Sequence, residues 1–402
     1  MMDERLLWPP PSFHVLAKPS GAICNLDCGY CYYLDKSDLY PGPPARMSEE
    51  VLESFIRQYI EAQRAPEVVF AWQGGEPTLM GLDFYRRAVE LQREHLPRGM
   101  RLLNTIQTNG VLVDDKWASF FAANEFLVGI SIDGPAPLHD AFRPDKGGGA
   151  TFERTMHGLE RLRARGVEFN VLAAVHAANA ARPLETYRFL RDEAGARFIQ
   201  FLPIVEKSAV GGKAGGRSVG ARAFGAFLSA VFDEWVTRDV GRVFVQAFDT
   251  ALASWAGVRP GLCVFEATCG AALVLEHNGD LYSCDHFVDR EHLLGNILRT
   301  PLRSLVDSDR QRRFGRTKEE SLPSFCRRCP VLFACRGGCP KDRIIETPDG
   351  ERGQNYLCEG YRMFFEHIDV PMRFMAAEVL AGRPASRVMD ACTPERSGGR
   401  SE

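Results

Sequence analysis

Short apolar runs rich in β-branched residues alternate, along the first half of the chain, with longer stretches whose apolar positions recur at helical spacing. This alternation is expected of repeated βα units around a parallel sheet. Because βα crossovers are right-handed, six such units predict a partial (β/α)6 barrel of the TIM type, open or closed. The predicted strands are residues 12–19, 67–74, 101–109, 126–133, 167–175 and 196–206.

The stretch 48–63 gives the clearest helical pattern between two of these strands. Ser48 stands where a side-chain oxygen can cap the first turn. One face of the helix would be apolar and turned to the sheet. The residues on that face are Leu52, Phe55, Ile56 and Tyr59.

The same patterns divide the chain into four parts. The barrel is expected over 10–238, and its last connection, 207–220, is Gly/Ser-rich and reads as a mobile loop. A linker is expected at 239–262. Residues 263–375 are rich in cysteine and have too little apolar periodicity for their length, which suits a domain whose core is partly replaced by metal. Residues 376–402 are small and polar, so we expect disorder there.

The charge and the N-terminus exclude several functional classes. In 402 residues, 49 Lys and Arg oppose 52 Asp and Glu, so the net charge is −3 and no basic surplus predicts a nucleic-acid or membrane partner. No apolar run approaches the ~20 residues of a membrane span. The first residues carry acids and prolines rather than an export signal, so a cytoplasmic location is expected.

The twelve cysteines indicate metal chemistry. Cytosolic thiols stay reduced, so clustered cysteines in such a chain favour metal ligands or catalysis over disulfides. Three stand close together near the N-terminus, eight fall between residues 263 and 358, and Cys392 stands alone. We therefore expect one small and one large metal module.

The small module, Cys24-x3-Cys28-x2-Cys31, directly follows the first predicted strand, at the barrel end where βα folds hold their chemistry. Three thiolates cannot saturate a [4Fe–4S] cluster, so one iron would need an outside ligand. The alternative is a zinc site completed by a histidine, although none lies nearby. With Tyr30 before its last cysteine, the motif resembles that of the radical SAM superfamily. This implies that S-adenosylmethionine chelates the open iron.

Polar and glycine residues follow the next predicted strands and would gather on the same rim. Each alone is equally typical of a turn, but together they favour a cofactor pocket. Arg143 could neutralise a carboxylate there, or it could be an exposed arginine. The Gly-Gly-Glu-Pro segment resembles the superfamily's motif that binds the methionine amino group. The candidates for cofactor binding are Tyr30, Gln73, Gly74, Gly75, Glu76, Ser131, Asp133 and Arg143.

The eight later cysteines divide naturally into two fully ligated clusters, with zinc ribbons as the alternative. Their arrangement resembles the SPASM extension of peptide-modifying radical SAM enzymes. That resemblance implies one cluster on Cys263, Cys269, Cys284 and Cys339. It implies a second on Cys326, Cys329, Cys335 and Cys358. A saturated cluster cannot bind substrate, but it can pass electrons.

Such cofactors would produce a 5′-deoxyadenosyl radical, which abstracts a hydrogen atom from a carbon of the substrate. If the substrate is oxidised by two electrons overall, the reaction also needs an acceptor for the second electron and a base for a proton. Asp285 is the best candidate base, because it directly follows the cluster ligand Cys284. His286 is a second candidate. The alternative for Asp285 is an ordinary turn aspartate.

Over about residues 12–370 the chain resembles the anaerobic sulfatase-maturating enzymes. This implies oxidation of a cysteine or serine in a sulfatase C/S-x-P-x-R motif to Cα-formylglycine, with three [4Fe–4S] clusters and S-adenosylmethionine. It also implies an unfolded or nascent sulfatase as substrate and a low-potential donor such as flavodoxin or ferredoxin. By the resemblance Asp285 is catalytic, Gln73 and Ser131 contact S-adenosylmethionine, and Tyr33 lies near the substrate. The segments that carry it are KPSGAICNLDCGYCYYLDKS, FAWQGGEPTL, IQTNG, GISIDGP, FIQFLPIVE, NGDLYSCDHFV and CRGGCPKDR.

Two alternatives remain open at this stage. The chain could be a SPASM-type maturase of another ribosomally made peptide, or a non-catalytic metal-binding scaffold.

Separately, Cys392 begins the sequence CTPER, which itself reads C-x-P-x-R. This tail could be a pseudo-substrate, a substrate in cis or a chance match.

Overall fold

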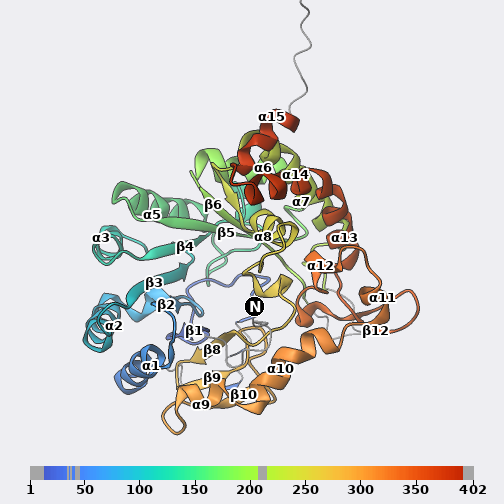
Figure 1. Cartoon of the computed structure of the whole chain (residues 1–402). Helices are drawn as coiled ribbons and strands as arrows, with labels where there is room; N and C mark the ends of the chain where they lie inside the picture. Colours follow the sequence, from blue (N-terminus) through green and yellow to red (C-terminus); the bar gives the residue numbers. More distant parts are fainter. Residues whose placement is uncertain (1–12, 34–35, 37–38, 41–45, 207–214, 393–402) are drawn as a thin grey trace, which may run out of the picture. The chain divides into compact units, whose positions relative to one another are not determined.

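The computed structural model describes residues 13–33, 36, 39–40, 46–206 and 215–392, which fall into two compact units (Figure 1). The first unit comprises Met1–Ala174 and Ala267–Leu322, and the second comprises Val175–Glu266 and Pro323–Glu402, within those described ranges. Each unit therefore combines segments that are distant in the sequence.

A parallel sheet forms the centre of the first unit. Five strands follow one another in sequence order, and the neighbouring pairs from β1–β2 to β4–β5 are all parallel. The predicted βα pattern is confirmed, with strand ends shortened where polar turn residues begin. The strands are β1 (His14–Lys18), β2 (Glu67–Trp72), β3 (Arg101–Thr108), β4 (Leu127–Ser131) and β5 (Phe169–Val175).

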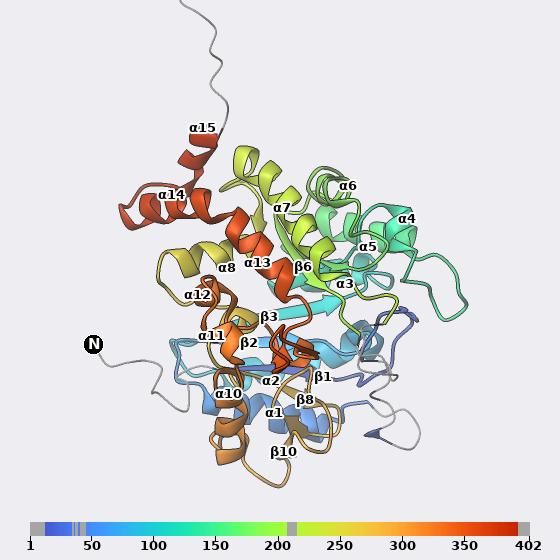
Figure 2. The ribbon, with the colours of Figure 1, turned by 90° about the vertical axis from the view of Figure 1, so that its right-hand side faces the viewer.

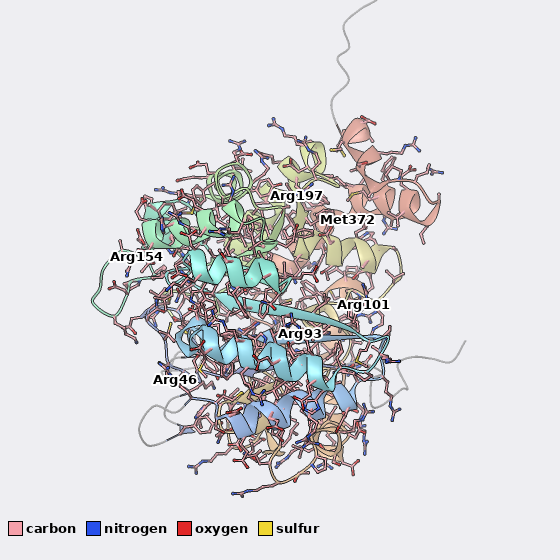
Figure 3. The ribbon with its side chains drawn as sticks, turned by 90° about the vertical axis from the view of Figure 1, so that its left-hand side faces the viewer. Arg46, Arg93, Arg101, Arg154, Arg197 and Met372 are labelled. Carbon is pink, nitrogen blue, oxygen red and sulfur yellow. The ribbon has the colours of Figure 1, made fainter. Side chains whose placement is uncertain are left out.

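Helices connect these strands and lie outside them (Figure 1; Figure 3 shows helices of this unit in front, with Arg93 of α2 labelled). Ser48 caps α1 as expected, because its Oγ accepts from Val51 N at 3.3 Å. The expected apolar face of α1 is buried, and the Phe55 ring packs on Phe70 of β2 at 5.6 Å. The helices are α1 (Glu49–Ala62), α2 (Leu82–His95), α3 (Asp115–Ala123), α4 (Ala136–His139) and α5 (Phe152–Ala164).

The sheet of the first unit continues beyond β1 with strands from the cysteine-rich segment. β8 (Ala272–Glu276) pairs in parallel with β1 in a register that ends at Lys18↔Glu276. Two antiparallel strands, β9 (Asp280–Tyr282) and β10 (Leu293–Asn296), extend it, and α9 (Leu302–Val306) and α10 (Asp309–Glu320) follow. The compact units therefore divide residues 263–375 differently from the sequence pattern, because backbone pairing joins part of this segment to β1.

The second unit is mainly helical. The sixth predicted strand appears here as β6 (Phe198–Pro203), which pairs in parallel with β7 (Phe244–Val245). α7 (Ala221–Arg238) and α13 (Cys358–His367) lie side by side (Figure 2). They approach so closely that a Cβ on Gly225 would come within 2.5 Å of Gly360 O. Helix packing at this distance needs glycine at the crossing point.

Further helices of the second unit include α8 (Gln246–Trp255), which lies within the expected linker 239–262. Phe248 of this helix is fully buried and stacks on Phe364 at 5.7 Å. Core packing therefore gives this segment a structure that its composition did not indicate. The other helices are α6 (Pro183–Arg188), α11 (Ser324–Arg327), α12 (Leu332–Cys335), α14 (Asp369–Leu380) and α15 (Val388–Cys392), with a π-helical turn, η4 (Phe189–Glu193).

The segment expected to be disordered, 376–402, is ordered as far as the structure describes it. It completes α14 and forms α15, and Glu378 holds the connection through ion pairs with Arg383 at 2.7 Å and Arg387 at 2.9 Å. Cys392 ends α15, and the rest of its CTPER sequence lies outside the described residues. So does most of the expected loop 207–220. Within the described ranges, no helix has the length and apolar character needed to cross a bilayer.

Candidate active site

The loop after β1 brings three cysteines together in the first unit. Leu26 N donates to Cys24 Sγ at 3.4 Å, and Cys31 N donates to Cys28 O at 3.0 Å. Burial raises the pKa of the Cys24 thiol to about 12, with smaller contributions from Glu76 and from the other two thiols. Three thiols that sense one another's charge in one loop form a donor set that fits a shared iron–sulfur cluster.

The Gly-Gly turn after β2 supports this cysteine loop. Gly75 N donates to Gly21 O at 2.8 Å, and Glu76 N donates to Ile23 O at 2.9 Å. A Cβ on Gly75 would lie 2.2 Å from Ile23 O. The backbone of the cysteine loop thus lies directly against Gly75, and the expected approach of a ligand at this glycine stays a prediction. Gly75 therefore contributes to the site by holding the loop.

Glu76 is fully buried, and its carboxylate joins the ends of β2 and β3. Oε1 accepts from Thr78 N at 3.0 Å, from Thr78 Oγ1 at 2.6 Å and from Thr108 Oγ1 at 2.8 Å, while Oε2 accepts from Asn109 N at 2.8 Å. Four protein donors therefore occupy both carboxylate oxygens, and the expected part of Glu76 in cofactor binding stays a prediction.

Replacing Gly75 by alanine is expected to destabilise the protein by about 1–3 kcal/mol, because the added methyl group overpacks against Ile23 O. The displaced loop should also retain less iron after reconstitution. Thermal melting and iron content measure the two effects. Gly216→Ala is the control, since nothing lies within 4 Å of its Cβ position. Equal melting temperatures and iron contents for the two variants would contradict the close approach.

Tyr30, Asp133 and Arg143 form one buried chain of hydrogen bonds. Tyr30 OH donates to Asp133 Oδ2 at 2.5 Å and accepts from Arg143 Nη1 at 2.8 Å, and Asp133 Oδ1 accepts from Ala174 N at 2.9 Å. Arg143 is buried, so the alternative of an exposed arginine is wrong. Burial raises the pKa of the Cys28 thiol, and the positive charge of Arg143 opposes this. The guanidinium is thus placed to stabilise a thiolate.

The two residues matched to S-adenosylmethionine contacts, Gln73 and Ser131, are half-buried at the ends of β2 and β4. Ser131 Oγ accepts from Gln107 Nε2 at 3.1 Å, and Gln73 Oε1 accepts from Lys18 Nζ at 3.5 Å. Both polar groups therefore stand on the rim that the sequence predicted.

Asp285 contacts Lys18, the last residue of β1, and Tyr32 in the cysteine loop. Its Oδ1 is 2.8 Å from Lys18 Nζ, and its Oδ2 accepts a hydrogen bond from the hydroxyl of Tyr32, the residue after Cys31. Burial acts to raise the pKa of Asp285, but the charges of Lys18 and His286 outweigh it and hold the pKa below its ordinary value. Asp285 thus has a charged partner and a hydrogen-bond partner far from its own turn in the sequence.

Tyr33 is 3 % exposed, and its hydroxyl donates to Glu276 Oε1. Tyr32, by contrast, is 47 % exposed. The expected place of Tyr33 near the substrate stays a prediction, and Tyr32 is the exposed tyrosine that bonds to Asp285. The sequence analysis did not single out Lys18, Tyr32 or Glu276. Their signals were weak, because Lys18 and Glu276 each end a strand and Tyr32 follows Cys31.

Four cysteines gather in the second unit. Burial, with smaller contributions from Cys358, Cys326 and Cys329, raises the pKa of Cys335 to about 12. These are the four that the SPASM resemblance assigns to one cluster. Of the other predicted set, Cys269 and Cys284 belong to the first unit, and Cys263 and Cys339 to the second.

All twelve cysteines lie in the described part of the chain, and no disulfide joins them. Among the same residues, no three His, Cys, Asp or Glu side chains are arranged as ligands of a single metal ion. The three thiols of the first loop, and the four that gather in the second unit, instead have the chemistry that iron–sulfur clusters require.

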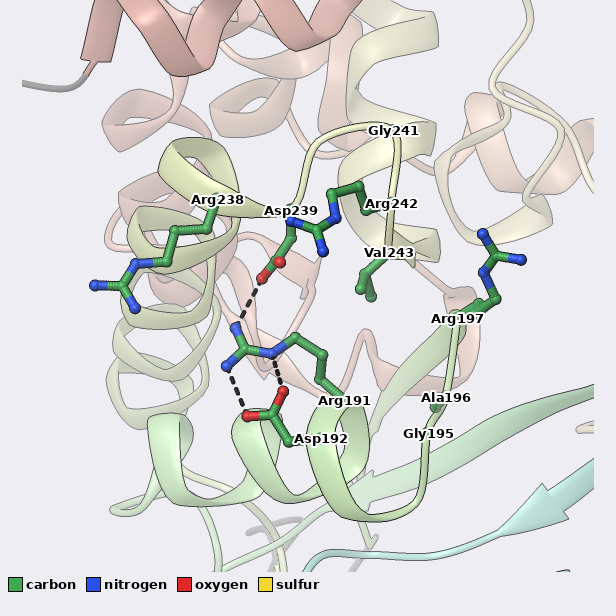
Figure 4. A pocket seen from close by; sticks show the side chains of 10 residues that line it. All are labelled: Arg191, Asp192, Gly195, Ala196, Arg197, Arg238, Asp239, Gly241, Arg242 and Val243. Carbon is green, nitrogen blue, oxygen red and sulfur yellow. Dashed lines mark hydrogen bonds and ion pairs between the residues drawn. The ribbon is translucent and has the colours of Figure 1, made fainter.

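A large surface hollow of about 690 Å³ lies in the second unit and is lined in part by arginines (Figure 4). Arg191 crosses it, with Nη1 2.8 Å from Asp239 Oδ2 and Nε 2.7 Å from Asp192 Oδ1. None of the predicted site residues lines this hollow, so it is separate from the candidate site.

Two family matches cover most of the predicted chemistry. Residues 19–190 match the Radical SAM superfamily, and residues 268–330 match an iron–sulfur cluster-binding domain, SPASM. The first match contains the loop of Cys24, Cys28 and Cys31, and the second contains Cys269, Cys284 and Asp285.

Curated relatives extend over nearly the whole chain. A serine-type anaerobic sulfatase-maturating enzyme of Bacteroides thetaiotaomicron is 46 % identical, covering 94 % of both chains. A serine-type enzyme of Klebsiella aerogenes is 40 % identical, covering 90 % of this chain and 87 % of its own. A cysteine-type enzyme of Clostridium perfringens is 33 % identical, covering 89 % and 96 %.

Solved structures agree with these relatives. Native anSMEcpe with bound AdoMet and the Cp18Cys peptide has a TM-score of 0.83 and is 31 % identical, covering 91 % of this chain and 99 % of its own. Streptococcus suis SuiB bound to its precursor peptide SuiA, at 16 % identity and a TM-score of 0.59, shares the fold alone. The chain belongs to the anaerobic sulfatase-maturating enzymes of the radical SAM superfamily.

Proposed function

We propose that this enzyme oxidises a serine or cysteine in a sulfatase S/C-x-P-x-R motif to Cα-formylglycine without oxygen. The observation that carries the proposal is the position of Asp285. This carboxylate directly follows the predicted cluster ligand Cys284, and it bonds to Tyr32 directly after the predicted ligand Cys31. A proton acceptor is thus held beside ligands of two redox centres.

The residues assigned to the cofactors follow from the donor sets described above. Cys24, Cys28 and Cys31 would hold the cluster that binds S-adenosylmethionine, near Gln73 and Ser131, and the remaining eight cysteines would hold two saturated clusters. When bound, these groups supply hydrogen-atom abstraction and an electron acceptor. Tyr30, Asp133 and Arg143 act together as one buried support beside Cys28.

Asp285 accounts for the proton of the reaction. Oxidation of serine to the aldehyde removes one hydrogen atom from Cβ, one electron, and one proton from the hydroxyl. We assign that proton to Asp285 Oδ2, because Oδ1 is already paired with Lys18. With cysteine the same three losses give a thioaldehyde, which water converts to the aldehyde with release of hydrogen sulfide.

Serine is the substrate residue that we infer this enzyme prefers. The serine-type relatives named above are 46 % and 40 % identical, whereas the cysteine-type relative is 33 % identical. The hydroxyl of Tyr32 already bonds to the Asp285 carboxylate. The side-chain hydroxyl of a substrate serine is the same kind of group. A hydroxyl therefore suits this position.

The test uses anaerobically reconstituted enzyme, dithionite, S-adenosylmethionine and two peptides that differ only in Ser or Cys at the first motif position. We expect the serine peptide to lose two hydrogen atoms and to react with an aldehyde probe, faster than the cysteine peptide reacts. A peptide with alanine at that position is the control. Deoxyadenosine release without an aldehyde would favour a maturase of another peptide. No cleavage of S-adenosylmethionine would favour a scaffold.

We further infer the partners and location from the same chemistry. The substrate would be an unfolded or nascent sulfatase, because the motif must reach Asp285 as an extended segment. A low-potential donor such as flavodoxin or ferredoxin would reduce the first cluster. The thiol ligands must remain reduced, which favours the cytoplasm.

A further inference from the structure

Lys18, the last residue of β1, carries a buried ammonium with no role in the reaction described so far. Its side chain is 2 % exposed. A lysine buried to this degree is stable only where its charge is paired and hydrogen-bonded. The groups that contact Nζ therefore indicate the role of the Lys18 charge.

Three residues of the candidate site surround the ammonium. Nζ lies 2.8 Å from Asp285 Oδ1 and donates to Gln73 Oε1 at 3.5 Å. It also lies 4.6 Å from the centre of the Tyr33 ring, within the range of a cation–π contact. One ammonium thus meets the proposed base, a residue assigned to S-adenosylmethionine, and the buried tyrosine of the cysteine loop.

The support beneath Lys18 is itself fixed. Lys18 is paired in register with Glu276 on the neighbouring parallel strand β8. The hydroxyl of Tyr33 donates to Glu276, so the ring against which Lys18 rests is held by the same strand. The ammonium therefore has a defined position from which to orient a carboxylate.

We propose that Lys18 is a positioning residue that holds Oδ1 of Asp285 and thereby directs Oδ2 to the substrate. The hydroxyl of Tyr32 donates to Oδ2. Because Tyr32 is 47 % exposed, it can yield this place to a substrate hydroxyl without opening the core. This inference rests on the proposed function of Asp285 and adds the group that sets its orientation.

The test replaces Lys18 by methionine, which keeps the length of the side chain but removes its charge. We expect the ratio of formylglycine to 5′-deoxyadenosine to fall about tenfold to a hundredfold, because the base is misplaced while the radical chemistry continues. KM for the serine peptide should stay near that of the wild type. Lys18→Arg, which keeps the charge, should recover part of the ratio.

Two comparisons separate positioning from a general loss of stability. Lys318→Met removes another buried lysine, 1 % exposed, in α10, and should leave the product ratio unchanged. The double variant Lys18→Met/Asp285→Asn should be no worse than Asp285→Asn alone, because two residues that act as a unit are not additive. Iron content and melting temperature are measured for every variant. If Lys18→Met loses iron, Lys18→Gln serves in its place, with the same expected direction.

A crystal structure of the Lys18→Met protein provides a readout that is independent of turnover. We expect the Asp285 carboxylate to leave its orientation toward Tyr32. An unchanged carboxylate together with an unchanged product ratio would overturn the role of Lys18. If the wild type forms no formylglycine from either peptide, the proposed function fails instead, and the orientation of Asp285 still decides whether Lys18 positions it.

Discussion

An Asp285→Asn enzyme is expected to form formylglycine at least about a hundredfold more slowly than the wild type, since a positioned base commonly contributes that much or more. Asparagine keeps the size of the side chain and can accept from Tyr32, but it cannot take a proton from the substrate. S-adenosylmethionine cleavage does not need this proton transfer. Deoxyadenosine should therefore still appear, uncoupled from aldehyde. Chromatography of deoxyadenosine and mass spectrometry of the peptide measure the two products.

Asp289→Asn is the matched control for this prediction. Asp289 lies four residues further along the same segment and pairs with His292, 2.8 Å from its Nδ1. Its carboxylate bonds to His292, whereas Lys18 and Tyr32 bond to Asp285, so its variant should keep the product ratio of the wild type. Near-normal formylglycine from Asp285→Asn would show that another group, such as His286, takes the proton.

The strands, the first helix and the cysteine motifs can be predicted from the sequence, because each depends on a local pattern. Ser48 and the apolar face of α1 follow from helical spacing. The loop of Cys24, Cys28 and Cys31 follows from its own spacing and from the strand before it. The rim also follows, because parallel strands end on the same side.

The roles of Gly75 and Glu76 could not be predicted in the same way. Glycine suits close approach to a ligand and close approach to another backbone equally well, and the position of Ile23 shows that Gly75 makes the second of these contacts. A glutamate after a strand can likewise face a cofactor or bind the next turn. Thr78 and Asn109 donate to the two oxygens of Glu76, so this side chain does bind the next turn.

Lys18 and Tyr32 were missed for a different physical reason. Lys18 meets Asp285 because β8 pairs with β1, and this register joins segments separated by most of the barrel sequence. No spacing within either segment shows that pairing. The same register joins residues 267–322 to the first unit, which is why the compact units depart from the boundary expected at residue 263.

Replacing Cys24, Cys28 and Cys31 together by alanine is expected to remove one cluster and abolish S-adenosylmethionine cleavage. The protein should retain the two clusters held by the other eight ligands, so iron should fall from about twelve to about eight atoms per chain. Neither deoxyadenosine nor formylglycine should form, because no iron remains with an open position. Iron analysis and anaerobic turnover with the serine peptide measure these losses.

Cys392→Ala is the control for the triple variant, because Cys392 is the one cysteine outside the predicted ligand sets. It ends α15, and its replacement should leave about twelve irons and wild-type turnover. A rise in turnover would instead indicate that the CTPER sequence competes with the substrate. Retention of twelve irons and of deoxyadenosine release by the triple variant would place the open cluster elsewhere, and the roles assigned to Arg143, Tyr32 and Asp285 beside it would lose their basis.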